Sequence, residues 1–370
     1  MPEMRLRVER LYFEMKPPFV LPSMEDVRRS RGTNGFTAIS TFSGCGGSCL
    51  GLEMAGFEIR AASEFVEAAR DTYRLNHDGV PISPADIRDI NGKHLLALAG
   101  LDEVDLLEGS PPCASFSTSG KREAGWGNVN DYSDTAQRSD DLFFEFARIL
   151  NEIQPKTFIA ENVKGLTVGT AIGYFKEILR RLRSCGYRVE ARIVDASLCG
   201  VPQKRQRLIF VGVREDLGLA PVFPAPLPYR YTIRDALGEF VSIPPNVGAL
   251  DPETGENLDF SKYAIGREYK NLRLGIVSRK YLNLVRVQPS KPCLTITATA
   301  GVVGAASVAH PFEPRKFNLR ELRALCSFPA DFELTGTYRE RAERIGRSVP
   351  PLMMKRIAET VRDEILRKAS

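Results

Sequence analysis

Short apolar runs alternate with amphipathic helical patterns from residue 36 to residue 214, and this alternation constrains the fold more than any other feature of the sequence. Six runs have the length of strands: 36–43, 57–64, 104–110, 157–163, 187–196 and 207–213. The stretches between most of them carry apolar residues at helical spacing, as at positions 142, 143, 146, 149 and 150. Strands that alternate with helices predict a mostly parallel sheet with helices on both faces.

The alternation stops near Asp216. Residues 219–315 are rich in proline, glycine and short mixed stretches, and a helical pattern returns with Asn318 as its expected N-cap. We therefore expect an N-terminal extension over 1–35 and an α/β domain formed by 36–218 and 315–370. The region 219–314 is expected to be a small, largely β or irregular domain.

Composition and charge narrow the class of protein. No run approaches the roughly 18 to 20 apolar residues that a membrane span needs, and the N-terminus lacks an apolar signal core. We therefore expect no membrane partner and a cytoplasmic location, with nucleoid association in a bacterium. The three histidines are scattered and the cysteines lack metal-site spacing, so no metal is expected. The net charge of +5 permits a polyanionic partner without requiring one.

The first candidate site is the glycine loop TFSGCGG at 41–47, between a predicted strand and a predicted helix. Backbone N–H groups and a helix N-terminus form a ligand cradle at such a turn. Glu64 follows Gly44 by 20 residues at the end of the next strand, where an acid usually binds ribose hydroxyls. The pattern predicts a ligand that contains a nucleoside, and it does not separate a dinucleotide from S-adenosylmethionine.

Three further motifs follow predicted strands or precede them. EGSPPCASFS at 108–117 places Cys113 in a turn stiffened by two prolines, where a thiol can act as a nucleophile. Glu161 follows an apolar strand at the same sheet edge, and burial there would raise its pKa. QKRQR at 203–207 puts Arg205 and Arg207 two positions apart, so a strand would point both guanidinium groups to one side. Forked guanidinium groups suit a carboxylate, a phosphate or a base carbonyl.

In this order the motifs resemble those of the DNA cytosine-5 methyltransferases. FSGCGG is similar to the cofactor loop of that family, SPPC to its nucleophile turn, ENV to its acid motif and QKRQR to its Gln-x-Arg-x-Arg motif. FNLRELRALCSFPADF and IGRSVPP, at 317–332 and 345–351, resemble its last two motifs. The resemblance covers residues 36–215 and 315–368, and six motifs in family order make a chance match very improbable.

The resemblance implies a Rossmann-like fold of S-adenosylmethionine-dependent methyltransferases, with 219–314 as the target-recognition domain. It implies a monomer that transfers a methyl group to carbon 5 of a cytosine flipped out of double-stranded DNA. Cys113 would attack carbon 6, Glu161 would hold N3 and the exocyclic amine, and Arg207 with Arg205 would hold the base carbonyl and the acid. The polar stretch after Cys113, which contains Lys121 and Trp126, resembles the loop that closes over DNA. The cofactor is expected to contact Phe42, Gly44, Gly46, Glu64, Asp86, Ile87, Pro112, Leu142, Arg347, Ser348 and Val349.

Arg347 is the motif position that departs from the family, which usually has asparagine there. A cation beside a sulfonium is unfavourable by like-charge repulsion unless a negative group lies between them. Arg347 could turn to solvent or a phosphate, or it could pair with a carboxylate on the cofactor. The second hypothesis includes carboxy-S-adenosylmethionine as donor and 5-carboxymethylcytosine as product.

Two hypotheses of a different class remain open at this point. The substrate could be tRNA, or the chain could be an inactive DNA-binding homologue. Ser348 and the prolines after it also predict a helix start, with the Ser348 side chain as its cap.

Overall fold

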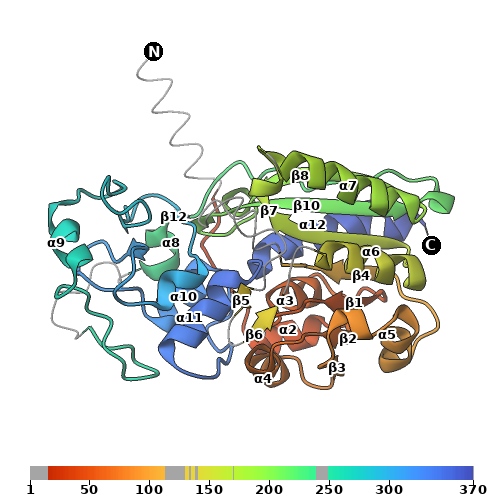
Figure 1. The fold of residues 1–370 in the computed structure, drawn as a ribbon, viewed down its shortest axis with the longest axis horizontal. Helices are drawn as coiled ribbons and strands as arrows, with labels where there is room; N and C mark the ends of the chain where they lie inside the picture. Colours follow the sequence, from red (N-terminus) through yellow and green to blue (C-terminus); the bar gives the residue numbers. More distant parts are fainter. Residues whose placement is uncertain are drawn as a thin grey trace, which may run out of the picture.

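The structure is a computed structural model that describes residues 16–112, 130–132, 135–137, 141–169, 171–238 and 249–369. A seven-stranded sheet forms the larger lobe, in the order β3-β2-β1-β4-β7-β10-β8 (Figure 1). Its strands are β1 (Thr37–Thr41), β2 (Glu58–Ser63), β3 (Ile82–Ser83), β4 (Leu106–Gly109), β7 (Thr157–Val163), β8 (Tyr187–Asp195) and β10 (Gln206–Arg214). All neighbours pair in parallel except β10, which is antiparallel to both β7 and β8. The predicted mostly parallel sheet is confirmed.

Helices cover both faces of this sheet, because successive strand residues point to opposite sides. Helices α5 (Gly92–Ala99), α6 (Leu142–Ile153) and α7 (Ala171–Ser184) share one apolar core with strand residues such as Ile39 and Phe158. On the other face, α3 (Gly47–Met54) and α12 (Pro351–Glu364) share a second core with alternate strand residues such as Ala38 and Ile159. Helix α4 (Glu67–Asn76) contributes the buried Tyr73 to this second core.

The reversed strand β10 matters for the site. The carboxyl ends of the parallel strands β1, β4 and β7 lie at one edge of the sheet, so the loops that follow them share that edge. Since β10 runs the other way, its first residues reach the same edge, and Arg207 pairs in register with Val163 at the end of β7. The segment before β10 and the loops after β1, β4 and β7 therefore meet at this edge of the sheet.

A second lobe lies beside the sheet and is largely irregular (Figure 1). Its elements are the helices α8 (Ile233–Leu237), α9 (Ala264–Asn271), α10 (Leu319–Leu325) and α11 (Tyr338–Arg347), and the short strands β11 (Val285–Arg286), β12 (Cys293–Leu294) and β13 (Val308–Ala309). Strand β12 pairs with β9 (Gln203–Lys204) of the larger lobe. One apolar core joins residues between Ile233 and Val308 to α10 and α11. It also includes residues of α2 (Met24–Ser30) and α3.

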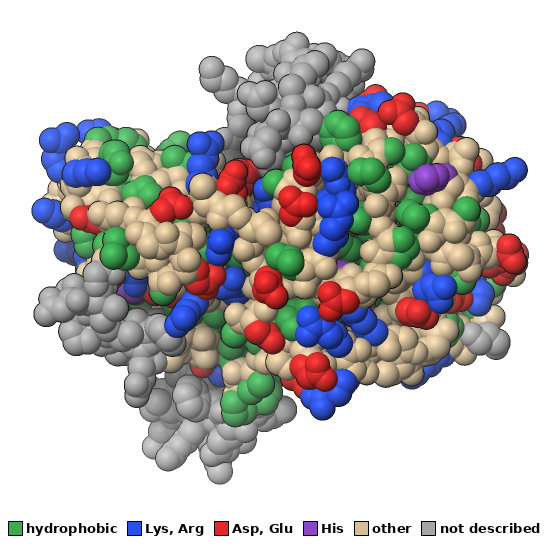
Figure 2. All heavy atoms as spheres, turned by 90° about the horizontal axis from the view of Figure 1, so that it is seen from below, with side chains coloured by type: hydrophobic (Ala, Val, Ile, Leu, Met, Phe, Trp, Pro, Cys, Tyr) green, Lys and Arg blue, Asp and Glu red, His purple; other side chains and the backbone are tan. Residues whose placement is uncertain are grey.

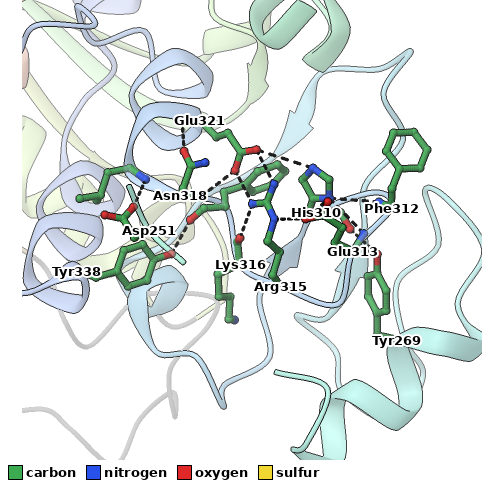
Figure 3. Close-up of polar contacts among 12 residues, drawn as sticks. Asp251, Tyr269, His310, Phe312, Glu313, Arg315, Lys316, Asn318, Glu321 and Tyr338 are labelled. Carbon is green, nitrogen blue, oxygen red and sulfur yellow. Dashed lines mark hydrogen bonds and ion pairs between the residues drawn. The ribbon is translucent and has the colours of Figure 1, made fainter. Parts of the chain in front are cut away.

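A buried polar network fastens these parts of the second lobe together (Figure 3). Arg315 donates to both carboxylate oxygens of Glu321, at 2.8 and 2.9 Å, and also pairs with Glu313. Asp251 Oδ2 accepts from the backbone N–H of Leu319 at 2.9 Å, at the start of α10. The network therefore links the loop around residue 251 to the helix that begins after Asn318.

The helix boundaries in this region test two expectations. Asn318 caps α10 as expected, because its Oδ1 accepts from the backbone N–H of Glu321 at 2.9 Å. The expectation for Ser348 was wrong. Its hydroxyl donates backwards to the carbonyl of Arg344 at 2.8 Å, so Ser348 ends α11, and α12 begins at Pro351 without a side-chain cap.

No helix in the described ranges is long and apolar enough to cross a membrane.

Candidate functional site

A cleft of ≈ 840 Å³ opens between the strand edge described above and the second lobe. Most of the predicted site residues line it: Phe42, Gly44, Glu64, Asp86, Ile87, Pro112, Leu142, Glu161, Arg205, Arg207, Arg347, Ser348 and Val349. The second lobe contributes Val277, Leu282, Asn283 and Thr297 among others. The structure thus brings together residues that lie more than 300 positions apart. Cys113, Lys121 and Trp126 fall outside the described residues.

Glu64 organises one end of the cleft. Its Oε2 accepts from the backbone N–H of Gly44, and its Oε1 accepts from that of Val66, both at 2.7 Å. The carboxylate therefore ties the glycine loop to the end of β2 while keeping lone pairs for other donors. Burial raises the pKa of Glu64, against these hydrogen bonds, which lower it.

The surroundings of Glu64 fit a nucleoside ligand. A carboxylate with unused lone pairs can accept from ribose hydroxyls, and Phe42, Ile87 and Leu142 supply apolar surface nearby. A Cβ added at Gly44 would meet no atom within 4 Å, so the loop is open on that side. The residues present therefore fit the adenosyl part of S-adenosylmethionine.

Gly46 serves a different purpose from Gly44. It has φ +93 and is the N-cap of α3, and a Cβ there would overlap the Nε2 atom of His77. His77 is buried, stacks on Tyr73 with ring centroids 4.3 Å apart, and holds Glu53 through Nδ1 at 3.1 Å from Oε1. The glycine is thus required by the packing below the loop, and sequence reasoning gave His77 no role.

Asp86 is held by a neighbouring arginine. It caps the short 3₁₀ turn Ile87–Asp89 by accepting from the backbone N–H of Arg88 at 3.0 Å. The Arg88 guanidinium also bonds Asp86 at 2.9 Å and Asp141 at 2.7 Å, at the start of α6. Ile87 is buried beside the cleft. Sequence reasoning missed Arg88, although a cation two positions after a capping aspartate is a readable signal.

Glu161 and Arg207 form an ion pair at the other end of the cleft, with Arg207 Nε 2.7 Å from Glu161 Oε1. Both side chains are largely buried. Burial raises the pKa of Glu161, although the charges of Arg207 and Arg205 oppose that rise. A carboxyl with a raised pKa next to a fixed cation can share a proton with a basic ring nitrogen.

Asn162 anchors the turn that precedes Cys113. Its Nδ2 donates to the carbonyl of Pro111 at 3.1 Å, and its side chain is buried. Two adjacent residues of one strand therefore have different roles, since Glu161 faces the cleft and Asn162 holds the Ser-Pro-Pro turn. The ENV motif contained this residue, and sequence reasoning assigned a role only to the glutamate.

Arg205 does not lie beside Arg207 in the way that strand alternation predicts, because it occupies the gap between β9 and β10. Its Nη1 donates to the carbonyls of Ile296 and Gly346, both at 2.9 Å, and its Nη2 to the carbonyl of Arg347 at 3.2 Å. The side chain is 2% exposed. Arg205 therefore clamps the end of α11 and a loop of the second lobe to the sheet.

Arg347 lies at the rim of the cleft and is exposed. Its Nε donates to Glu343 Oε1 at 2.8 Å, one helical turn earlier. The negative partner of this unusual cation is therefore a residue of its own helix. In the part of the chain that the structure describes, there is no group of three His, Cys, Asp or Glu side chains that could hold a metal ion.

Comparison with known proteins adds a family context. The family model described as C-5 cytosine-specific DNA methylase matches residues 36–363. The chain is 32% identical to the type II methyltransferase M1.HphI of Haemophilus parahaemolyticus over 88% of this chain and 86% of that protein. It is also 32% identical to M.NgoFVII of Neisseria gonorrhoeae, over 87% and 85% of the two chains. Among solved structures it resembles a protein of an E. coli prophage, solved as a DNA modification methyltransferase, with TM-score 0.69 and 23% identity over 90% of this chain and 99% of that one.

Proposed function

The chain belongs to the family of C-5 cytosine-specific DNA methylases, and from this premise we propose how its residues carry out the reaction. Family membership makes it a DNA cytosine-5 methyltransferase of the restriction–modification type. The family also implies S-adenosylmethionine, which supplies a methyl group from its sulfonium. The observation that carries the proposal is the Glu161–Arg207 pair, which lies beside a turn held by Asn162.

The proposed reaction begins at Cys113. Its thiolate sulfur forms a bond to carbon 6 of the flipped cytosine, and the electron pair of the 5,6 double bond becomes available at carbon 5. Carbon 5 would then use this pair to bond the methyl group, while the sulfur–methyl bond of the donor breaks with its electrons on sulfur and leaves a neutral thioether. Carbon 5 next loses its proton to water, and the electrons of that carbon–hydrogen bond re-form the 5,6 double bond. The bond from Cys113 sulfur to carbon 6 breaks with its electrons on sulfur, and N3 returns its proton to Glu161.

Glu161 and Arg207 stabilise the charge that this attack creates. Attack on carbon 6 is easier when N3 receives a proton, which the Glu161 carboxyl can donate because burial raises its pKa. Arg207 keeps Glu161 in place and presents its remaining donors toward the base carbonyl. Arg205 acts indirectly, because its guanidinium nitrogens donate to backbone carbonyls of the second lobe and of α11.

The cofactor would lie at the Glu64 end of the same cleft. Glu64 would accept from the ribose hydroxyls, Phe42 and Leu142 would pack against the adenosyl part, and Ser348 and Val349 would close the far wall. Asp86 is turned to Arg88, so its proposed contact with the adenine uses a carboxylate lone pair that the arginine does not occupy.

The second lobe offers a basic surface for DNA. Exposed cations are concentrated between residues 262 and 280: Lys262, Arg267, Lys270, Arg273, Arg279 and Lys280, against the single acid Glu268. Figure 2 shows basic side chains gathered at the end of the molecule that carries α9. Val277, Leu282 and Asn283 of the same segment line the cleft, so this surface adjoins the proposed chemistry. We place the reaction in the cytoplasm, on DNA of the nucleoid.

The ordinary methyl donor is favoured over a carboxylated one. A carboxylated donor would need a free cation, whereas the Nε of Arg347 already bonds Glu343. The same pairing reduces the repulsion that a sulfonium would meet, since the glutamate offsets the arginine's charge.

The test is to express the wild-type chain and a Cys113→Ser variant in a host that lacks cytosine methylation, digest its DNA to nucleosides and weigh them. We expect 5-methylcytosine with the wild type and none with the variant. Carboxymethylcytosine would establish the carboxylated donor, and unmodified DNA with well-folded wild-type protein would refute the proposal. Sequencing that maps the modified positions then allows a sharper test. A duplex with 5-fluorocytosine at the mapped base should trap a covalent complex, because fluorine cannot leave as a proton does.

A further inference from the structure

A buried carboxyl group lies beneath the floor of the cleft, and the mechanism above does not use it. Glu108 is the last residue but one of β4, pairs in register with Ser40 of β1, and is 1% exposed. It does not line the cleft. A carboxyl in such a place needs hydrogen-bond donors, because burying it without them is costly.

Two serine hydroxyls from two different segments provide those donors. Ser40 Oγ donates to Glu108 Oε2 at 2.6 Å, and Ser110 Oγ donates to Oε1 at 3.2 Å. The hydroxyl of Ser48, in the first turn of α3, also lowers the pKa of this carboxyl. A further hydrogen bond leads toward the cleft, because Ser43 Oγ donates to Ser40 Oγ at 3.0 Å.

These hydroxyls connect the two halves of the cleft. Ser43 and Ser48 belong to the glycine loop and the helix after it, whereas Ser110 opens the Ser-Pro-Pro turn that leads to Cys113. All three line the cleft. A single carboxyl below the floor is therefore linked by hydrogen bonds to both walls. Ser40 and Ser43 connect it to the wall expected to hold the cofactor, and Ser110 connects it to the wall expected to hold the nucleophile.

We infer that Glu108 is a positioning residue, which couples the cofactor loop to the nucleophile turn through Ser40 and Ser43 on one side and Ser110 on the other. This inference rests on the proposed function, since it assigns the two walls of the cleft their partners. An ionised carboxylate can accept from both hydroxyls at once. A protonated carboxyl carries its proton on one oxygen, so that oxygen donates to its neighbour instead of accepting from it. One of the two charge-assisted hydrogen bonds is then replaced by a weaker neutral one, and the link between the two walls weakens.

The charged and titratable groups around Glu108 place this change near neutral pH. Burial and, to a smaller extent, the charge of Glu161 on β7 raise the pKa of Glu108 to about 7, against the serine hydroxyls, which lower it. Cys49 of α3 also faces this carboxyl, and its own pKa is raised by burial and by Glu108, so it stays a neutral thiol. The coupling should therefore be complete at alkaline pH and weaken as the pH falls through about 7.

The experiment measures methyl transfer from labelled S-adenosylmethionine to unmethylated genomic DNA across neutral pH, at several cofactor concentrations. For the wild type, we expect kcat/KM for the cofactor to rise with pH through an ionisation near 7. In Glu108→Gln this ionisation disappears, and kcat/KM at alkaline pH falls on the order of tenfold. Glu321→Gln, which removes a buried carboxyl of the second lobe, should keep the wild-type pH profile.

Ser40→Ala provides a second test, which does not depend on whether the Glu108→Gln variant folds. The Ser40 hydroxyl lowers the pKa of Glu108, so its removal should move the same ionisation to higher pH without abolishing it. An unchanged profile in either variant would overturn the inference. Failure of the wild type to label DNA would instead refute the proposed function, so the two failures are distinguishable.

Discussion

Arg207 and Glu161 face each other across two antiparallel strands, with the guanidinium Nε 2.7 Å from a carboxylate oxygen. Their strands, β7 and β10, run in opposite directions at the site. The two residues are therefore brought together by the sheet and not by their spacing in the sequence. The pair fixes a carboxyl that can exchange a proton with a bound base while a cation holds it in place. Catalysis should depend on both members and on their charge.

Glu161→Gln keeps the size of the side chain and removes its proton. We expect kcat for methyl transfer to fall by about 10²–10⁴-fold, the usual contribution of general acid catalysis. KM for S-adenosylmethionine should change little, because Glu64 lies at the other end of the cleft. Glu190→Gln, on strand β8, is the matched control and should leave kcat unchanged. A wild-type kcat in Glu161→Gln would remove Glu161 from the mechanism.

Arg205→Met should lower the free energy of unfolding and weaken cofactor binding, and it should not act directly on the methyl-transfer step. The change leaves the carbonyls of Ile296, Gly346 and Arg347 without their donor. Each unpaired buried group costs roughly 1–3 kcal/mol, so the free energy of unfolding should drop by at least about 3 kcal/mol. Urea denaturation measures this drop, and calorimetry should show weaker cofactor binding, because Ser348 and Val349 follow the released carbonyls. If stability were unchanged, Arg205 would not be the clamp that its contacts describe.

Gly46→Ala should destabilise the protein through His77. A methyl group at residue 46 overlaps the imidazole, and φ +93 is unfavourable for any residue with a Cβ. We expect a loss of about 2–4 kcal/mol in unfolding free energy, the sum of overpacking and backbone strain. In the double variant with His77→Ala the overlap is relieved, so the two changes should cost less together than the sum of their separate costs. Strict additivity would show that His77 is not what excludes a side chain at residue 46.

Arg279→Gln with Lys280→Gln should weaken DNA binding without changing the target sequence. Removing two cations that contact phosphates lowers the slope of log K against log salt by about 2. Titration of duplex DNA at several salt concentrations measures this slope. Arg180→Gln with Arg181→Gln, on helix α7, removes the same charge elsewhere and should leave the slope unchanged. Equal slopes in the two double variants would place the DNA away from the second lobe.

Glu108 should also affect how the free energy of unfolding depends on pH, and this effect does not require DNA. Its pKa is raised in the folded state, so its favourable contribution is fully present below the unfolded pKa near 4.5 and is lost as the pH rises through about 7. The difference between these values corresponds to roughly 3 kcal/mol. Glu108→Gln should therefore lose less stability than the wild type between acid and alkaline pH. Parallel pH dependences would show that Glu108 does not titrate in this range.

The sequence predicted the α/β sheet, the Asn318 cap and a set of site residues most of which line the cleft, because these depend on local pattern and on motifs at strand ends. It failed where a competing local partner or a distant contact decides the outcome. Ser348 reads as a helix cap beside two prolines, yet its hydroxyl is drawn to Arg344 of the preceding helix. Arg205 and Arg207 read as a matched pair, but one belongs to a gap between strands and reaches carbonyls over 90 residues away. Glu108 had no visible signal, since its partner Ser40 lies 68 residues away in the sequence and meets it only in the folded sheet.

The shared core of α10, α11 and the segment that begins near Ile233 bears on how such enzymes acquire new targets. A chimera with its crossover near residue 315 would divide that core and separate Arg315 from Glu321. Viable recombinants should instead exchange the whole stretch from the linker before Ile233 to the proline pair at the start of α12. The segment that such enzymes can exchange is therefore longer than the variable region itself, and it includes residues that form one wall of the cofactor cleft.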